Sequence, residues 1–443
     1  MVERTLPDAV SIAAIGRVLE LVGDGAATWA EDGRGRRLPL SGGDPGTGAH
    51  GVSGGSGAAG LSRAWRSWTA AATALDDPGL PATGQVALGG FAFRPERTPA
   101  GAWAGFPAAL LRVPQLAVVR SAGRCFSVAS MLARPGESTG DVGRRLARLG
   151  RLLRLAGPGA DADPPAKIRA VPGPGERARW EDAVTGAVTE LRAGRLQKVV
   201  LARALLARAD RPVHLARVLA ALRAAYPAGH TFAVGGADGT CLVGSSPELL
   251  VDRRGDRLVS QPLAGSTGRA PTAGGDRRLA LALRGDPKEQ AEHRVVVEDI
   301  VERLAPYASR IEVGAAPTVL RLPTIQHLAT TIRARLTGTP LPSALDVAAA
   351  LHPTAAVGGS PRHAALRLQG ELEGLERGWY TGAIGWVDGR GDGELALALR
   401  CGLLWQEGAL CFAGAGIMPG SDPAREWAET ELKLMPLLRA LAS

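Results

Sequence analysis

Residues 412–434 read FAGAGIMPGSDPAREWAETELKL, and they join the end of an apolar strand to an acidic helix. The alternation of apolar residues predicts a strand over Ala409–Gly414. The helical spacing of apolar residues further on predicts a closing helix over Pro423–Leu441. Outward from this stretch, strands and helices follow without strict alternation, which favours an α+β fold over a doubly wound sheet.

The same periodicities predict the other elements. Strands are expected over Gln85–Phe93, Leu110–Val113, Leu116–Arg120, Lys198–Ala207, Thr231–Val234, Thr240–Gly244 and Leu258–Gln261. Helices are expected over Val142–Leu155, Arg179–Ala193, Val213–Ala225, Glu289–Leu304 and Val347–Leu351. Glycine-bearing turns predict an antiparallel meander of Tyr380–Val387, Glu394–Leu404 and Ala409–Gly414. Residues 1–60 read as irregular, with a flexible Gly-rich loop over 41–60, and Gly157–Gly175 reads as a linker.

The chain of 443 residues carries a formal charge of +9, almost all of the excess being arginine. The arginines are scattered and form no basic block, so a compositional preference is favoured over a nucleic-acid-binding surface. Part of the charge could instead serve a small anionic substrate. The four cysteines form no CxxC pair, and no apolar run is long enough to cross a membrane. The first residues do not have the pattern of a signal peptide, so we expect a cytoplasmic protein without a membrane partner.

Two pairs of glutamates have a spacing that suits metal binding. Glu289 and Glu292 are three residues apart on one predicted helix, and Glu426 and Glu429 are three apart on the last, so each pair projects from one helix face. Two such faces could hold a hard divalent cation such as Mg²⁺. Glutamate pairs at this spacing are also common on solvated helices. Lys433 lies four residues after Glu429 on the same predicted helix, so it could be only a surface salt-bridge partner of Glu429.

Other polar residues interrupt apolar surroundings. Lys198 opens an apolar strand, as either a strand-edge charge or a partly desolvated base. Glu248 follows a strand, as either a general acid with a raised pKa or a polar turn residue. Arg400 lies within an apolar strand and needs a partner, for which a carboxylate is suited. Tyr380 and His327 are plausible polar groups in a cleft, although neither is specific alone.

Nine motifs follow one another along the chain in a fixed order. They are QKVVLAR (197–203), GSSPELL (244–250), SQPLAGS (260–266), KEQAEH (288–293), TIQHLAT (324–330), HPTAAVGG (352–359), YTGAIGW (380–386), ALRCG (398–402) and FAGAGI through EWAETELKL (412–434). Together they resemble the chorismate-utilising enzymes, and most closely the isochorismate synthases. The resemblance covers roughly residues 180–441 and is loose before them. It implies a single large α+β domain of β-sheets packed face to face with helices outside, with residues 1–175 as a divergent N-terminal part and 176–443 as the catalytic region.

The resemblance also implies roles for individual residues. Lys198 matches a lysine that activates water for attack at C2 of chorismate, and Glu248 matches the acid that protonates the departing C4 hydroxyl. Mg²⁺ would lie between Glu292 and Glu429, with Glu289 and Glu426 as the outer pair. The remaining matches are expected to bind substrate: Tyr380, Arg400 and Lys433 as clamps on carboxylates, the backbone at Gly414 and Gly416 beside them, His327 in the pocket lining, and Ser266, where many relatives carry Thr.

Several alternatives stay open at this point. Lys198 argues against anthranilate synthase, and Ala264 against aminodeoxychorismate synthase. Salicylate synthase, which goes on to eliminate pyruvate from isochorismate, shares Lys198, Glu248 and the glutamates. A basic nucleic-acid-binding protein and a scaffold that has lost activity are the other classes considered. The expected partner is the small molecule chorismate, with no nucleic acid and no glutaminase subunit, in a monomer or weak homodimer.

Overall fold

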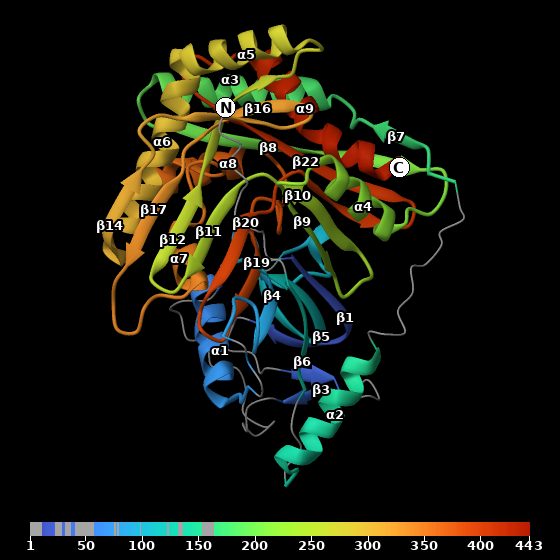
Figure 1. Ribbon diagram of the computed structural model, residues 1–443. Coiled ribbons are helices and arrows are strands. Elements are labelled where there is room, and N and C mark those ends of the chain that lie inside the picture. Colours follow the sequence, from blue (N-terminus) through green and yellow to red (C-terminus); the bar gives the residue numbers. More distant parts are fainter. Residues whose placement is uncertain are drawn as a thin grey trace.

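The computed structural model describes residues 11–22, 29–31, 37–39, 57–74, 77, 79–97, 99–121, 124–131, 136–152 and 164–443. Two large antiparallel sheets lie face to face and helices cover their outer sides, which confirms the predicted α+β fold (Figure 1). No helix in these ranges is long and apolar enough to cross a membrane.

The larger sheet has twelve strands within the described residues. Its order is β14 (Ala308–Val313), β17 (Ile332–Leu336), β12 (Arg257–Gln261), β11 (Leu249–Arg254), β20 (Gly393–Leu397), β19 (Ala383–Asp388), β4 (Val86–Phe91), β5 (Ala109–Ser121), β1 (Ser11–Val22), β2 (Trp29–Glu31) and β3 (Arg37–Pro39), with β6 (Arg124–Ala129) also on β5. Strands from both sides of the expected boundary at residue 175 therefore share one sheet.

The second sheet has seven strands in the same ranges. Its order is β18 (Gly359–Ser360), β8 (Lys198–Ala209), β22 (Gly408–Ile417), β21 (Cys401–Trp405), β10 (Cys241–Ser246) and β9 (His230–Gly235), with β7 (Ile168–Val171) also on β8. A separate three-stranded sheet is formed by β13 (Leu263–Gly268), β16 (Ile325–Ala329) and β15 (Thr318–Arg321).

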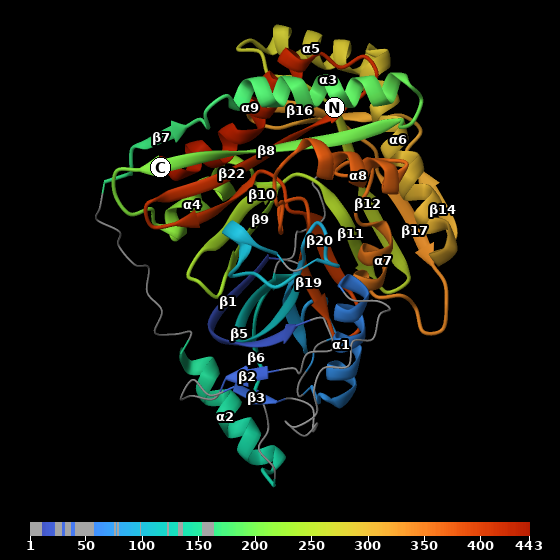
Figure 2. The ribbon, with the colours of Figure 1, turned by 180° about the vertical axis from the view of Figure 1, so that it is seen from behind.

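Helices cover the sheets from outside. They are α1 (Ala58–Ala71), α2 (Thr139–Leu152), α3 (Glu176–Arg192), α4 (Leu215–Ala225), α5 (Ala273–Gly285), α6 (Pro287–Leu304), α7 (Ala344–Leu351), α8 (Arg362–Leu372) and α9 (Pro423–Leu441), with short 3₁₀ turns η1 (Gly101–Trp103) and η3 (Ala305–Tyr307). Figure 2 shows α3 along the outer side of β8, with α9 beside it. The helices α1 and α7 pack together on the larger sheet, and α5 and α6 pack on the three-stranded sheet.

The core between the two large sheets is apolar. Leu110 and Ile384 of the larger sheet pack in one cluster with Ala202, Leu242 and Phe412 of the smaller one. Each is almost completely buried. Removing a side chain of the size of leucine or phenylalanine from water contributes about 1.5–3 kcal/mol, so this layer holds the sheets against each other.

The chain crosses directly from one large sheet to the other at two neighbouring points. Residues 247–248 lead from β10 in the smaller sheet to β11 in the larger one, and residues 398–400 lead from β20 back to β21. Because β10 pairs with β21 and β11 pairs with β20, the two crossings lie side by side. The predicted meander is therefore wrong: Glu394–Leu404 is two strands in different sheets, and Arg400, with a φ of 51°, turns the chain between them.

Other expectations also needed correction. Residues 11–22, 29–31 and 37–39 are strands, so the interpretation of residues 1–60 as irregular is wrong there. The expected loop over 41–60 overlaps α1 from Ala58 onward, and its residues 41–56 lie outside the described part. The expected linker over 157–175 contains β7. The two strands expected over 110–113 and 116–120 are one strand, because Pro114 does not interrupt β5.

Candidate active site

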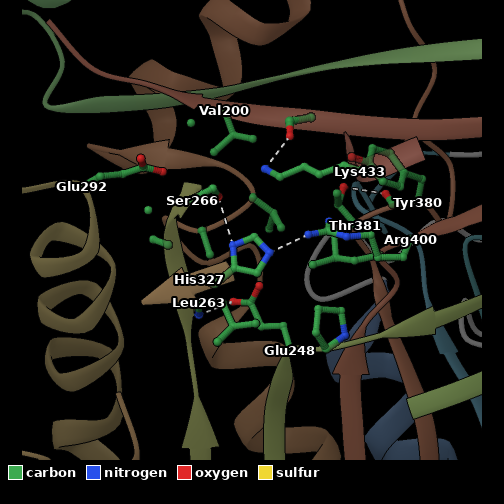
Figure 3. Close-up of a pocket in the computed structure, with 18 residues that line it drawn as sticks. Val200, Glu248, Leu263, Ser266, Glu292, His327, Tyr380, Thr381, Arg400 and Lys433 are labelled. Carbon is green, nitrogen blue, oxygen red and sulfur yellow. Dashed lines mark hydrogen bonds between the residues drawn. The ribbon is translucent and has the colours of Figure 1, made fainter. Parts of the chain in front are cut away.

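A pocket that is partly open to solvent lies where the two crossings meet the three-stranded sheet (Figure 3). Nine of the residues predicted from sequence line it: Glu248, Ser266, Glu292, His327, Tyr380, Arg400, Gly414, Gly416 and Lys433. The other four lie behind this lining. Lys198 and Glu429 pair with the lining residues Glu292 and Lys433, Glu289 accepts from the backbone N–H of Ser266, and Glu426 is joined to Glu289 through Lys288. The structure thus gathers residues that are more than 200 positions apart in the sequence.

Glu248 is a buried carboxyl on the first crossing. Its side chain accepts a hydrogen bond from the backbone N–H of Leu263 at 3.4 Å. Burial raises the pKa of Glu248 to about 7, against the opposing effect of the nearby cations Lys198 and Arg400. A carboxyl of this kind can hold a proton near neutral pH and give it to a departing group.

Arg400, His327 and Ser266 form a chain of hydrogen bonds. Arg400 Nη2 lies 2.8 Å from His327 Nε2, and His327 Nδ1 lies 3.0 Å from Ser266 Oγ. Burial, and then the charge of Arg400, lowers the pKa of His327 well below its usual value, so the ring is neutral. Since a guanidinium can only donate, His327 Nε2 accepts and Nδ1–H donates to Ser266. The hydroxyl hydrogen of Ser266 is left to donate elsewhere.

Arg400 has more donors than partners. It is 8 % exposed, and its Nε has no hydrogen-bond partner among the described residues. A buried guanidinium with unused donors is costly unless an acceptor arrives, and a carboxylate fits its planar fork. Figure 3 shows Arg400 beside His327, with Lys433 on one side of the ring and Glu248 on the other.

Lys198 lies behind the pocket wall rather than on it. Its Nζ is 3.0 Å from Glu292 Oε1, and its side chain is 1 % exposed. The strand β22 passes close to this pair at Gly416, where an added Cβ would lie 2.0 Å from Glu292 Oε1 and 2.9 Å from Lys198 Cε. Only glycine leaves room there for this ion pair.

Lys433 and Tyr380 form the opposite wall. Lys433 Nζ lies 2.5 Å from Glu429 Oε1 and donates to the carbonyl of Gly414 at 2.9 Å. Tyr380 stacks on Phe412, with ring centroids 5.1 Å apart. Burial raises the pKa of Tyr380, so its hydroxyl stays protonated and can donate to an anion.

The four glutamates face one another across α6 and α9. Burial, followed by repulsion from Glu292, raises the pKa of Glu289, and burial followed by repulsion from Glu429 raises the pKa of Glu426 to about 7. Burial would also raise the pKa of Glu429, but Lys433 lowers it overall. Lys288 donates to both Glu426 and Glu289. Buried carboxylates that repel one another favour a cation between them.

The donor set fits a hard cation, although the carboxylate oxygens do not yet converge on one. In the described residues no three His, Cys, Asp or Glu side chains form a ready metal-binding group. In this arrangement Lys198, Lys288 and Lys433 each bond a glutamate oxygen. Mg²⁺ needs only one or two protein carboxylates, with water and substrate oxygens completing its shell, so the residues suit it.

A family profile for chorismate binding enzymes matches residues 51–442. The chain belongs to the chorismate-binding enzymes. The salicylate biosynthesis isochorismate synthase of Pseudomonas aeruginosa is 38 % identical over 357 residues, which are 80 % of this chain and 74 % of that protein. The isochorismate synthase MenF of Bacillus subtilis is 34 % identical over 360 residues, 81 % of this chain and 75 % of its own length.

Solved structures agree with the family. The menaquinone-specific isochorismate synthase MenF from Escherichia coli has a TM-score of 0.65 at 28 % identity, over 81 % of this chain and 79 % of that one. Anthranilate synthase component I from Streptococcus pneumoniae has a TM-score of 0.74 over 99 % of this chain and 94 % of that one. Its 23 % identity shows a shared fold alone.

Sequence reasoning missed part of the lining of this chorismate-binding enzyme. Pro247, Leu263, Gly265, Val357 and Thr381 all face the pocket. Most are apolar or contribute backbone, and such residues carry no chemical signal in a sequence. Thr381 could have been suspected from its place beside Tyr380, but its φ of 63° is visible only in the structure.

Proposed function

We propose that this chorismate-binding enzyme is an isochorismate synthase, which converts chorismate to isochorismate. The observation that carries the proposal is the placement of a buried, protonatable Glu248 and the unused donors of Arg400 in one pocket, with the amine of Lys198 behind its wall. The relatives named as isochorismate synthases support the same reaction.

Chorismate carries two carboxylates, and the pocket offers several groups that attract them. Arg400 can bind one carboxylate through its fork, while Lys433 and the Tyr380 hydroxyl add donors on the opposite wall. The backbone of β22 comes close to the pocket at Gly414 and Gly416, so N–H groups there can also approach an anion. Binding of a dianion thus relieves the unmatched positive charge of the pocket.

Lys198 is the base in this proposal and Glu248 is the acid. Lys198 takes a proton from water as the water oxygen bonds to C2 of the ring. Both ring double bonds shift, from C1=C2 to C1=C6 and from C5=C6 to C4=C5, as the C4–O bond breaks. Glu248 gives its proton to the departing hydroxyl, so that one water is consumed and one is released. In the described arrangement Lys198 is paired with Glu292, so this role requires the pair to separate.

We also propose that Mg²⁺ takes part. Glu292 and Glu429 would hold it, with Glu289 and Glu426 around them, and when bound it would neutralise a substrate carboxylate. Burial, followed by repulsion from Glu292 and from Glu429 respectively, raises the pKa values of Glu289 and Glu426, which supports a cation at this place.

The cellular setting is proposed on similar grounds. The described thiols of Cys241, Cys401 and Cys411 are free, which suits a reducing cytoplasm. A monomer or weak homodimer that works without a glutaminase subunit remains our prediction.

The test is to incubate the purified protein with chorismate and Mg²⁺, with and without a chelator, and to separate the products by liquid chromatography. Isochorismate in equilibrium with chorismate, lost on chelation, is the expected result. Salicylate and pyruvate as products would assign the protein to the salicylate synthases instead. No turnover at all would contradict the proposal.

A further inference from the structure

The lysines of this chain are concentrated at the glutamates. Lysine and arginine together number 52, yet only four of these residues are lysines. Three of the four bond a glutamate beside the pocket: Lys198 bonds Glu292, Lys433 bonds Glu429, and Lys288 bonds the outer pair. The proposed function assigns roles to Lys198 and Lys433, but it assigns none to Lys288.

Lys288 joins the two helices that carry the glutamates. It is the second residue of α6, directly after Pro287. Its Nζ lies 2.9 Å from Glu426 Oε1 on α9 and 3.3 Å from Glu289 Oε1 on its own helix. One ammonium therefore bonds both members of the outer pair. The Lys288 side chain is 29 % exposed, so it can leave this place for water without crossing the core.

The chemistry of lysine suits a contact that can be exchanged. An arginine would grip a carboxylate through two parallel hydrogen bonds, whereas an ammonium is a compact charge on a flexible stem. The oxygens that Lys288 holds are also hard ligands of the kind that Mg²⁺ prefers. A divalent cation that approaches Glu426 or Glu289 must share those oxygens with Lys288 and is repelled by its charge.

We propose that Lys288 is a resident counter-ion that competes with the divalent cation for Glu289 and Glu426. It stabilises the outer pair when no metal is bound and weakens metal binding in the absence of substrate. Glu292 and Glu429 are then left as the main carboxylate ligands. The inference rests on the metal site of the proposed function.

The test measures cation binding directly, without chorismate. Metal-free protein is titrated with Mn²⁺, and free Mn²⁺ is followed by its electron paramagnetic resonance signal. Lys288→Met should bind Mn²⁺ about tenfold more tightly than the unaltered protein, because it removes a unit charge a few ångströms from the site. Lys288→Arg keeps the charge and should bind no more tightly. Lys167→Met, which removes the lysine that lies outside the glutamate cluster, should leave the affinity unchanged.

A purely structural role predicts a different pattern. If Lys288 only ties α6 to α9, Lys288→Met lowers the melting temperature and binds Mn²⁺ no more tightly, and that result overturns the inference. Should the Met variant fail to fold, Lys288→Gln removes the same charge and keeps a polar end. The chorismate assay on the unaltered protein separates the two proposals. If the unaltered protein turns over chorismate but Lys288→Met binds Mn²⁺ no more tightly, only the role of Lys288 is contradicted. If Lys288→Met binds Mn²⁺ more tightly but the unaltered protein shows no turnover, only the proposed function is contradicted.

Discussion

At the scale of the residue, burial gives the pocket groups their properties. Glu248 holds a proton near neutral pH because it is buried, and His327 is neutral for the same reason. Arg400 cannot lose its charge under these conditions, so its buried donors need an anion. The protonation states of Glu248 and His327 do not follow from residue type alone, since exposed Glu and His behave differently.

The first prediction concerns Glu248. Its pKa of about 7 lies above the usual value, so the protonated form predominates below that pH and is lost as the pH rises through it. Chorismate turnover should therefore fall as the pH rises past 7. Glu248→Gln should lower kcat by about 10²–10⁴-fold, because the amide cannot give up a proton. Steady-state rates on both sides of pH 7 would check this, and a variant with unaltered kcat would refute the assigned acid.

A second prediction concerns the fork of Arg400. Arg400→Lys keeps the charge but loses the planar donor set and the contact to His327 Nε2. We expect kcat/KM for chorismate to fall about 10–100-fold, chiefly through KM. Arg310→Lys is the matched control, because Arg310 forms an exposed pair with Glu312 far from the pocket. Equal effects of the two changes would show that Arg400 does not bind substrate.

At the scale of the element, the pocket depends on strands that pass very close to side chains. β22 lies between β8 and β21 and brings Gly416 against the pair of Lys198 and Glu292. The sequence motif FAGAGI indicated a close approach of backbone to an anion. The structure adds that Gly416 also clears space for the base and for a glutamate of α6.

The third prediction follows from this packing. Gly416→Ala would place a methyl group 2.0 Å from Glu292 Oε1, so the pair must move apart. Turnover should fall at least tenfold while the fold is kept, as judged by circular dichroism. Gly274→Ala is the control, since nothing lies within 4 Å of a Cβ at that helical position. A Gly416→Ala variant with full turnover would contradict the proposed role of Lys198 in the reaction.

At the scale of the whole molecule, the pocket forms where the chain changes sheet. Periodicity predicted fewer than half of the described strands, among them β8 and β22, and the helices α3, α6 and α9. An alternating pattern also does not tell which sheet a strand joins. Hence Glu394–Leu404 read as one strand, although it crosses between sheets at Arg400. The helix α5 was missed because Gly274 and Gly275 lie in its first turn.

The candidate site was predicted more completely than the fold, through motif resemblance rather than periodicity. Nine of thirteen expected residues line the pocket, and the other four lie behind it. The place of Lys288 could not be predicted, because its partner Glu426 lies on α9, far along the chain. Pairings between distant elements arise only in the folded molecule.

The central claim is that water enters at C2 as the C4 hydroxyl leaves. The most direct measurement is turnover of chorismate in H₂¹⁸O, followed by mass spectrometry of the products. Isochorismate should carry one ¹⁸O, chorismate should gain the label as the reaction approaches equilibrium, and Lys198→Ala should incorporate essentially none. Isochorismate that forms without label, or full incorporation by Lys198→Ala, would contradict the account.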